Sequence, residues 1–410
     1  MDSTIQQSEI PDTLERLSGK ELMSNPYGVL AKLRERSPAI PIESWGTRMW
    51  VITRYEDVCR VLSDPTIVRD LAKHRHEIKE HCVTRDNDRR ARIPQGAHSS
   101  LFYQEGESYD KVRRLAAQYF TPNQLKNLAH VTHEIVKEAM DNFRPGQQID
   151  FIADYARPIS AKVFCQLVGI PFNEQNMQTL LKTEEIVSSD KSRIEQAAQT
   201  LIAWAKELVE IKQREPGEDL FSSLVKLQEE IGMTPDQLTS EYIVVAIGSM
   251  EPAKAISNGA FLFLTHPDQL AKALAGPDLF ETCVDEIVRY ESSFRFVPPR
   301  YTTAPVELDG VTIPAGEILL VCVGSANRDP NFIADADVFD ITRKTSGHVG
   351  FGHGMHKCLA AQLARNQTGI ALRTFFERFP ATTLAEPPDK ARWSPEKSRR
   401  KLEALPVILG

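Results

Sequence analysis

Apolar residues at helical spacing run through most of this 410-residue chain, and they constrain its fold more than any other feature of the sequence. Side chains three and four positions apart lie on the same face of an α-helix, so this pattern predicts helices that each bury one face. The predicted helices span residues 26–36, 129–142, 194–214, 239–264, 279–291 and 358–379.

Strand patterns are short and fall in two places, at residues 50–53 and in hairpin-like pieces across 300–323. The length alone would suggest two or three domains at about 150 residues each. No repeat of fixed period and no low-complexity linker divides the sequence, however. We therefore expect one mainly α-helical domain with small β-sheets over residues 21–410, after an N-terminal tail of residues 1–20.

Composition excludes several classes of protein. The chain has 49 Lys and Arg against 56 Asp and Glu, a net charge of −7, which does not suggest a nucleic-acid partner. It has no apolar run of about 18 residues and no signal-peptide pattern at its start, so no membrane segment is expected. Its six cysteines follow no pairing rhythm. We expect reduced thiols and a cytoplasmic location.

One cysteine stands in a sequence unlike those around the other five. Residues 347–360 read GHVGFGHGMHKCLA and run directly into the last predicted helix. Closely spaced glycines permit a tight backbone path beside a bulky flat partner, and Cys358 then lies at a helix N-terminus. That position favours a thiolate, because the helix dipole lowers the pKa of a thiol. A lone cysteine is more often a buried structural thiol, but the glycine loop reverses this preference.

This segment resembles the haem-binding loop of the soluble bacterial cytochrome P450 family, F-G-x-G-x-H-x-C-x-G. The matching residues are Phe351, Gly352, Gly354, His356 and Cys358. The resemblance implies that haem b is the cofactor and that Cys358 is the thiolate ligand of its iron, which favours O–O cleavage. Ala360 replaces the last glycine of the motif, a departure of one methyl group that we expect the fold to tolerate.

Two further motifs match the same family. Glu286 and Arg289 lie one helical turn apart, which alone is typical of a solvated pair on a helix surface. Here the apolar neighbours predict a partly buried helix, where the two charges need another partner. The family supplies that partner from a downstream F-D-x-x-R stretch, and Arg343 ends the match at 339–343. The resemblance makes these three residues a structural triad behind the haem.

Haem propionates in a largely closed protein need cationic or strong hydrogen-bonding partners. By resemblance these are Arg300, after two prolines, and the histidines His348 and His356 that flank the glycine loop. Upstream, Tyr109 and Arg113 match the H-x-x-x-R helix of the family, with tyrosine in place of histidine. Each residue alone would be an ordinary surface charge, but their shared order and spacing favour haem binding.

The sequence departs from the family in the long helix predicted at 239–264. The family signature there is a glycine followed by an acid and an alcohol, which help to deliver protons during oxygen activation. In this chain Gly248 aligns with the glycine, but Met250 holds the acid position, Glu251 the alcohol position and Pro252 the next one. Proline removes the amide that would bond to the carbonyl of residue 248, so we expect a kink there.

Two interpretations of Glu251 stay open from the sequence. In the first, Glu251 is catalytic and carries protons in place of the missing relay, beside the freed carbonyl of Gly248. In the second, its side chain faces away and pairs with a basic neighbour such as Lys254. The phase of a helix does not settle the direction of a residue beside a kink.

Substrate contacts are predicted at the kink and after the triad helix, at Gly248, Met250, Phe296 and Val297, although the aromatic residue could equally belong to the core. Residues 73–82 contain three histidines and a cysteine, but their spacing fits no zinc template and their mixed charges favour a solvated segment. In the family this segment often lines the substrate entrance, and its polarity would suit a polar or extended substrate.

Electrons are expected to come from separate proteins, because the family match leaves no room for a flavin or nicotinamide domain. Lys111, Arg114 and Lys357 predict a basic patch near the thiolate that would suit an acidic ferredoxin-type donor, itself served by a reductase. Scattered solvated lysines are the alternative interpretation of these charges.

The function that follows is a haem-thiolate oxidoreductase acting on a small molecule, with a specialised oxidation of the natural-product tailoring kind. The altered oxygen-activation segment favours substrate-assisted oxidation or oxidative coupling, and ordinary hydroxylation is the alternative. A non-catalytic haem or ligand-binding protein is the alternative from another class. Retention of Cys358 argues against it, because a protein that needed only the fold could lose the thiolate.

Overall fold

The computed structural model describes residues 15–16, 22, 25–44, 47–71, 73–79, 99–186, 191–396 and 398–410. Most of them are helical, which confirms the predicted fold class. The α-helices are α2 (Pro26–Arg36), α3 (Tyr55–Ser63), α4 (Glu107–Ala117), α5 (Pro122–Ala139), α6 (Arg157–Val168), α7 (Glu174–Glu185), α8 (Lys191–Arg214), α9 (Leu220–Ile231), α10 (Pro235–Ser249), α11 (Glu251–Thr265), α12 (Pro267–Ala275), α13 (Leu279–Tyr290), α14 (Val323–Ala326) and α15 (Ala361–Arg378). Short 3₁₀ or π turns are η4 (Leu101–Tyr103), η5 (Gln118–Phe120), η6 (Phe151–Ala156), η7 (Gly354–His356) and η8 (Pro388–Lys390).

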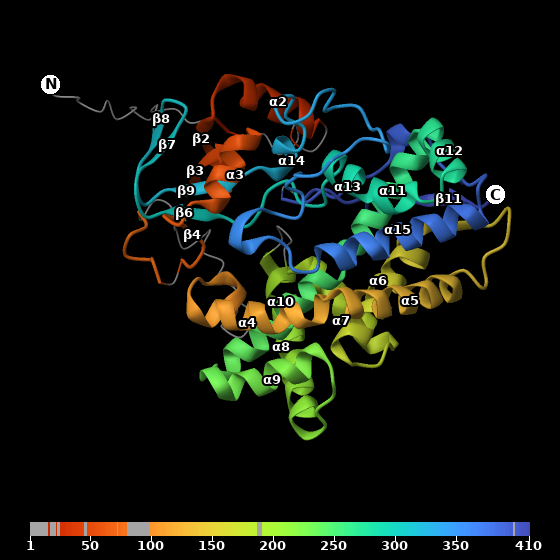
Figure 1. Cartoon of the computed structure of the whole chain (residues 1–410), viewed down its shortest axis with the longest axis horizontal. Coiled ribbons are helices and arrows are strands. Elements are labelled where there is room, and N and C mark those ends of the chain that lie inside the picture. The colour runs from red at the N-terminus through yellow and green to blue at the C-terminus, as the bar shows by residue number, and fades with distance from the viewer. Residues whose placement is uncertain are drawn as a thin grey trace.

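The strands form small sheets near the N-terminal helices α2 and α3 and near the C-terminus. They are β1 (Glu15–Arg16), β2 (Ala39–Ser44), β3 (Thr47–Ile52), β4 (Ile67–Val68), β5 (Gln148–Asp150), β6 (Arg300–Thr302), β7 (Val306–Leu308), β8 (Val311–Ile313), β9 (Ile318–Val321), β10 (Thr383–Leu384) and β11 (Pro406–Ile408). The largest sheet has the order β1-β2-β3-β9-β6-β4, the second is β10-β11-β5, and β7 and β8 form a hairpin. Figure 1 shows the larger sheet at one end of the molecule and the helices filling the rest.

The order of strands explains why distant motifs meet. β3 pairs in parallel with β9, with Trp50 opposite Leu319, and β9 pairs antiparallel with β6, with Leu319 opposite Arg300. Strand β9 is buried along its whole length, as expected for a central strand of a covered sheet. The sheet therefore holds the start of β6, and with it Arg300, in a fixed place.

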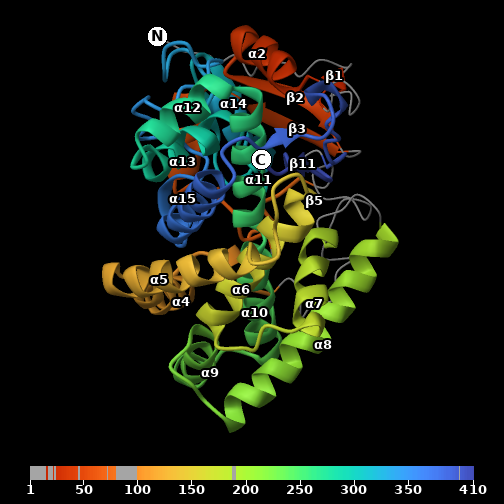
Figure 2. The same cartoon turned by 90° about the vertical axis from the view of Figure 1, so that its right-hand side faces the viewer.

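The long helix predicted at 239–264 is present but broken. Thr234 and Gln237 form a capping box at the start of α10, with Pro235 at the first helical position. α10 ends at Ser249 and α11 begins at Glu251, with Met250 between them. Figure 2 shows the two helices almost end to end through the middle of the molecule. The predicted break is confirmed, because Pro252 has no amide to continue the hydrogen-bond ladder.

Helix α15 lies in the main core and packs on α5, α11 and α13. Its aromatic residues Phe375 and Phe376 are fully buried, and their rings contact those of Phe151 and Phe263. Edge-to-face contacts of this kind add to the burial of the rings themselves. The packing fixes the direction of α15, and therefore the place of the loop that precedes it.

Several predicted boundaries moved. The helix predicted at 26–36 has the predicted bounds. The helix predicted at 129–142 starts earlier, at Pro122, because Thr121 caps it there, and the apolar pattern does not reveal a polar cap. Of the predicted tail, Glu15–Arg16 pair with β2, and the rest of residues 1–20 lies outside the described residues. Among the described residues no helix is long and apolar enough to span a membrane.

Candidate functional site

The cysteine loop is a tight turn that ends at α15. The backbone N–H of Cys358 donates to the carbonyl of Phe351 at 2.8 Å, which closes the loop. Gly352 has φ 77°, in the left-handed region that glycine adopts without strain. A Cβ on Gly352 would meet no atom closer than 3.7 Å on its own loop, so the glycine serves backbone conformation here. The helix begins at Ala361, three residues after the cysteine rather than at it.

Cys358 differs from the other free cysteines that the structure describes. Its side chain is exposed, whereas Cys165, Cys283 and Cys322 are buried and Cys59 is half-buried. Protein that surrounds the thiol at longer range desolvates it and raises the pKa of Cys358, while the backbone N–H of Ala360 acts in the opposite direction. The amide at the helix terminus acts in the predicted direction, but burial outweighs it, so the expected lowering of the thiol pKa is not seen without the iron. Coordination to iron is the stronger effect that would deprotonate the thiol.

Helix α4 holds the cysteine loop from one side. The hydroxyl of Tyr109 donates to the carbonyl of Met355 at 2.7 Å, and it accepts from Nη1 of Arg113 at 3.2 Å. Nη2 of Arg113 donates to the carbonyl of Lys357 at 2.8 Å. Both predicted residues of the H-x-x-x-R match therefore lie on the loop that carries the cysteine. Tyrosine serves in the place of histidine because its hydroxyl can both donate and accept.

Arg300 places a buried positive charge close to the same loop, beside the imidazole of His356. Arg300 is only 6% exposed, and Nη1 donates to the carbonyl of Pro298 at 2.8 Å. Burial, and after it the nearby cation of Arg69, lowers the pKa of Arg300 to about 9. Burial also lowers the pKa of His356, whose Nε2 is buried and has no hydrogen-bond partner among the described residues. Such a cluster is suited to an anionic ligand.

The structure revises the interpretation of His348. Its Nδ1 accepts from the backbone N–H of Gly350 at 3.1 Å, and its Nε2 lies 3.0 Å from Oδ1 of Asp285. Both ring nitrogens are thus used within the protein, on the side of α13, which argues against the predicted contact with a propionate. Asp285 also accepts from Nε of Arg365, at 2.6 Å, and the Arg365 guanidinium lies over the Phe351 ring.

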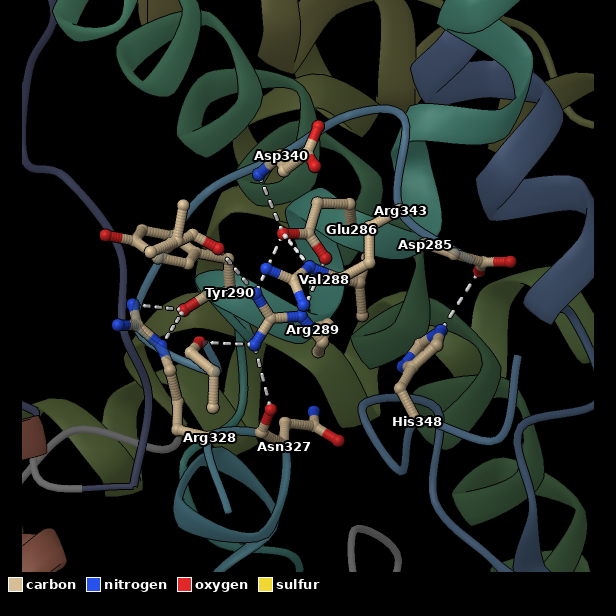
Figure 3. A network of polar contacts seen from close by, with 12 residues as sticks. Asp285, Glu286, Val288, Arg289, Tyr290, Asn327, Arg328, Asp340, Arg343 and His348 are labelled. Carbon is tan, nitrogen blue, oxygen red and sulfur yellow. Dashed lines mark hydrogen bonds and ion pairs between the residues drawn. The ribbon is translucent and has the colours of Figure 1, made fainter. Parts of the chain in front are cut away.

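The predicted triad is present, with Glu286 and Arg289 buried and Arg343 half-buried. Nε and Nη2 of Arg289 lie 2.6 and 2.8 Å from the two carboxylate oxygens of Glu286, and both side chains are fully buried. Nε of Arg343 lies 3.7 Å from Oε1 of Glu286. Arg289 also donates to backbone carbonyls, including that of Asn327 at 3.0 Å (Figure 3). These added hydrogen bonds are what a buried ion pair needs to offset its desolvation.

At the break between α10 and α11, the two residues predicted to contact the substrate have different surroundings. Gly248 is exposed, and a Cβ placed on it would meet no atom within 4 Å, so there is open space beside this turn. Met250 is fully buried in the apolar core with Leu224 and Leu238. The expectation of a substrate contact at Met250 is therefore not supported, because its side chain fills the core.

Glu251 begins α11 and makes two ion pairs. Its Oε1 lies 2.7 Å from Nζ of Lys254 and 3.1 Å from Nη2 of Arg399. Burial acts to raise the pKa of Glu251, but the cations of Arg399 and Lys254 hold it below its usual range. The pairing with Lys254, one of the two interpretations left open, is thus present. Oε2 is buried without a hydrogen-bond partner among the described residues.

The segment after α13 belongs mainly to the core. Phe296 is 2% exposed and packs with Leu320 and Cys322 of the sheet region. Val297 donates its backbone N–H to the carbonyl of Val321 at 3.1 Å. The Val297 side chain packs on the apolar cluster that contains Val321. Of the two interpretations of the aromatic residue, the structure supports the core.

The residues of the predicted basic patch are paired or exposed, and the histidine-rich segment shows no metal site among the described residues. Lys111 pairs with Glu107 at 2.7 Å, while Arg114 and Lys357 are exposed. Among the residues that the structure describes, no group of histidine, cysteine and acidic side chains could hold a metal ion. His81 and Cys82, the end of the segment 73–82, lie outside the described residues.

Sequence reasoning missed three charged residues of the site region. Arg69 follows β4, and Glu105 accepts its backbone N–H at 2.6 Å and that of Asp70 at 3.1 Å. Glu241 of α10 is fully buried and accepts from the backbone N–H of Leu101. For Glu241, an acid inside an apolar helix pattern was the available signal. For Arg69 and Glu105 there was none, because their partners are distant in sequence.

Comparisons with known proteins cover nearly the whole chain. The family model described as cytochrome P450 matches residues 272–402. 6-Deoxyerythronolide B hydroxylase of Saccharopolyspora erythraea is 32% identical over an alignment of 397 residues, which covers 93% of this chain and 96% of that protein. The tirandamycin C-bound P450 monooxygenase TamI has a TM-score of 0.89 at 27% identity, covering 97% of this chain and 100% of that one. CxnD, a cytochrome P450 for C–S bond formation in chuangxinmycin biosynthesis, has a TM-score of 0.88 at 26% identity, covering 97% and 98%.

Proposed function

This chain belongs to the cytochrome P450 family, and we propose that it carries out a specialised oxidation of a small molecule in which the substrate completes the proton supply. Family members carry haem with iron bound by a cysteine thiolate. Two similar proteins, one named 6-deoxyerythronolide B hydroxylase and one described for C–S bond formation in chuangxinmycin biosynthesis, support a role in natural-product tailoring. When bound, the haem would supply oxygen activation and one-electron chemistry.

The residues of the chain fit that cofactor. Cys358 would bind the iron: of the cysteines that the structure describes it is the exposed one, in a loop that α4 holds in place. The buried cation of Arg300 and the unpartnered Nε2 of His356 suit the carboxylates of haem, since buried positive charge without a counterion is costly. Tyr109 and Arg113 position the loop through its backbone carbonyls. A single domain over residues 21–410 and a cytoplasmic location are also part of this proposal. The five free cysteines among the described residues support the location.

The oxygen-activation segment carries the proposal of substrate assistance. Met250 stands where the family has an acid, and it is fully buried in the core. Glu251 stands where the family has an alcohol, and two cations hold its carboxylate. The exposed turn at Gly248 leaves room for a substrate group at this point. A hydroxyl of the substrate would then take the place of the missing alcohol and hand on the proton.

Substrate analogues test this proposal. Candidate polyketides, peptides and polycyclic compounds are first titrated while the spin state of the iron is followed. For a compound that binds, turnover is measured with a ferredoxin and its reductase, and the ratio of product to electrons is compared with that of its deoxy analogue. Substrate assistance predicts a lower ratio and more hydrogen peroxide for the analogue. Equal ratios for both compounds would contradict the proposal and favour ordinary hydroxylation.

The proton-carrier role of Glu251 stays a prediction, and Oε2 is the atom that would serve it. Glu251→Gln and Glu251→Ala both remove that proton site. If Glu251 carries protons, both variants lower the ratio of product to electrons, with a larger solvent isotope effect in the glutamine variant. Unchanged product yield and electron use in both variants would show that the carboxylate serves structure only.

Oxidative bond formation is the second candidate reaction, favoured by the likeness to CxnD across 97% of the chain. Electron supply from a ferredoxin-type donor belongs to the same proposal, with Arg114 and Lys357 as exposed cations for docking. Lys111 contributes less than the sequence suggested, because Glu107 already pairs with it. Reduction by a ferredoxin that does not depend on ionic strength would contradict this docking surface.

A further inference from the structure

Arg69 belongs to none of the family motifs, and it adds a second positive charge to the cluster of Arg300 and His356. Burial lowers the pKa of Arg69, and the cation of Arg69 is in turn a cause of the lowered pKa values of Arg300 and His356. The cations of Arg69 and Arg300 therefore repel one another in a poorly hydrated place, beside the imidazole of His356. The three residues come from three separate parts of the chain, the turn after β4, the start of β6 and the cysteine loop.

The described residues around this cluster do not balance its charge. Glu105 is the nearby carboxylate, 3.8 Å from Nε2 of His356, and it is already held by the backbone N–H groups of Arg69 and Asp70. Nε of Arg69 and Nε2 of His356 are buried without a hydrogen-bond partner among the described residues. One carboxylate, itself held by two backbone N–H groups, against the two cations of Arg69 and Arg300 leaves a site for additional negative charge.

The guanidinium of Arg69 is fixed in direction although part of it is exposed. It lies over the ring of Tyr103, 4.5 Å from the ring centroid. Its Nη1 donates to the carbonyl of Phe102 at 3.1 Å. A guanidinium already held by an aromatic ring and a carbonyl loses little conformational entropy when it binds an anion. Each hydrogen bond that it donates therefore contributes more to binding.

We propose that Arg69 is a second cationic partner of the haem propionates, beside Arg300 and the imidazole of His356, and that Glu105 positions it through the backbone. Haem carries two carboxylates, and they supply the negative charge that the surroundings of the two arginines lack. The contact would be a charge-assisted hydrogen bond from Arg69 to a propionate oxygen. This inference rests on haem binding by the chain and on no particular substrate.

The rate of haem loss tests the proposal. Purified wild type, Arg69→Gln, Arg69→Lys and the control Arg75→Gln are mixed with excess apomyoglobin, and haem transfer is followed by absorbance. Arg75 lies on the same segment and is exposed, so its variant makes the same change of charge away from the cluster. We expect on the order of tenfold faster loss from Arg69→Gln, the effect of one hydrogen bond to a charged group. Arg69→Lys should lie between it and the wild type.

The reduction potential gives a second readout. Removal of a positive charge beside haem favours the ferric state, so Arg69→Gln should have a lower potential than Arg75→Gln. Haem loss and potential equal to those of the wild type would overturn the role of Arg69. A wild-type carbon monoxide complex without the red shift typical of thiolate ligation would instead overturn the assignment of Cys358. If Arg69→Gln does not accumulate in folded form, Arg69→Lys with the same two measurements decides the question.

Discussion

Glu241 makes the stability of this protein fall as the pH rises. Its side chain is fully buried in α10, where Oε1 accepts from the backbone N–H of Leu101 and Oε2 lies 2.9 Å from the hydroxyl of Ser100. Burial raises the pKa of Glu241 from 4.5 to about 8, although these hydrogen bonds act in the opposite direction. The folded protein therefore keeps the proton at neutral pH, whereas the unfolded chain releases it above about pH 4.5.

The magnitude follows from the two pKa values. Below pH 4.5 both states hold the proton, and the group costs nothing. Between pH 4.5 and 8 the unfolded state loses the proton first, so the free energy of unfolding falls. The difference of 8 − 4.5, or 3.5, at 1.36 kcal/mol for each pKa unit, gives an upper bound of about 5 kcal/mol, reached near pH 8.

Glu241→Gln tests this reasoning, because glutamine keeps the acceptor for Leu101 and removes the ionisation. The haem-loaded protein is unfolded in urea at pH 5, 6.5 and 8 and followed by circular dichroism. The variant should match the wild type near pH 5 and exceed it by about 2 to 5 kcal/mol at pH 8. The exposed Glu230→Gln on α9 is the control and should show no such trend. A difference between Glu241→Gln and the wild type that does not grow with pH would refute the reasoning.

Two further predictions concern α13. Glu286→Gln leaves the buried Arg289 without a counterion, so it should lower the free energy of unfolding, measured in urea, by about 3–5 kcal/mol. The control Glu281→Gln, at an exposed position on the same helix, should change this free energy little. Burial acts to raise the pKa of Asp285, but hydrogen bonds from His348 and Arg365 hold it below its usual value. Asp285→Asn should therefore cost more stability at pH 7 than at pH 3, as thermal unfolding would show; an equal loss at both pH values would contradict the ion pairs.

Local features of this fold could be predicted from the sequence. The helix at Pro26–Arg36 has its predicted bounds, because Asn25 caps it and proline starts it. The break at Met250 followed from the missing amide of Pro252. The pairing of Glu286 with Arg289 followed from their spacing on one helix. Each of these depends on residues within about one helical turn.

The directions of side chains between distant segments could not be predicted. His348 turns to Asp285, which is 63 residues away, and Arg69 meets Glu105 across 36 residues. Phe296 enters the core rather than the substrate region, because strands β3 and β9 bring an apolar surface beside it. Family motifs identify which residues matter, but the packing of the elements decides what each side chain contacts.

Glu251 shows why its structural and chemical roles have to be separated by experiment. As the first residue of α11 its negative charge is stabilised by the helix dipole, and Lys254 and Arg399 stabilise it further. A neutral variant at this position therefore leaves the buried Lys254 with less compensation, and the resulting loss of stability could lower turnover without any proton transfer. Glu251→Asp keeps the charge but shortens the side chain. If this variant is as stable as the wild type but has a lower ratio of product to electrons, the carboxylate of Glu251 carries protons. Parallel losses of stability and turnover would show that Glu251 only stabilises the helix break.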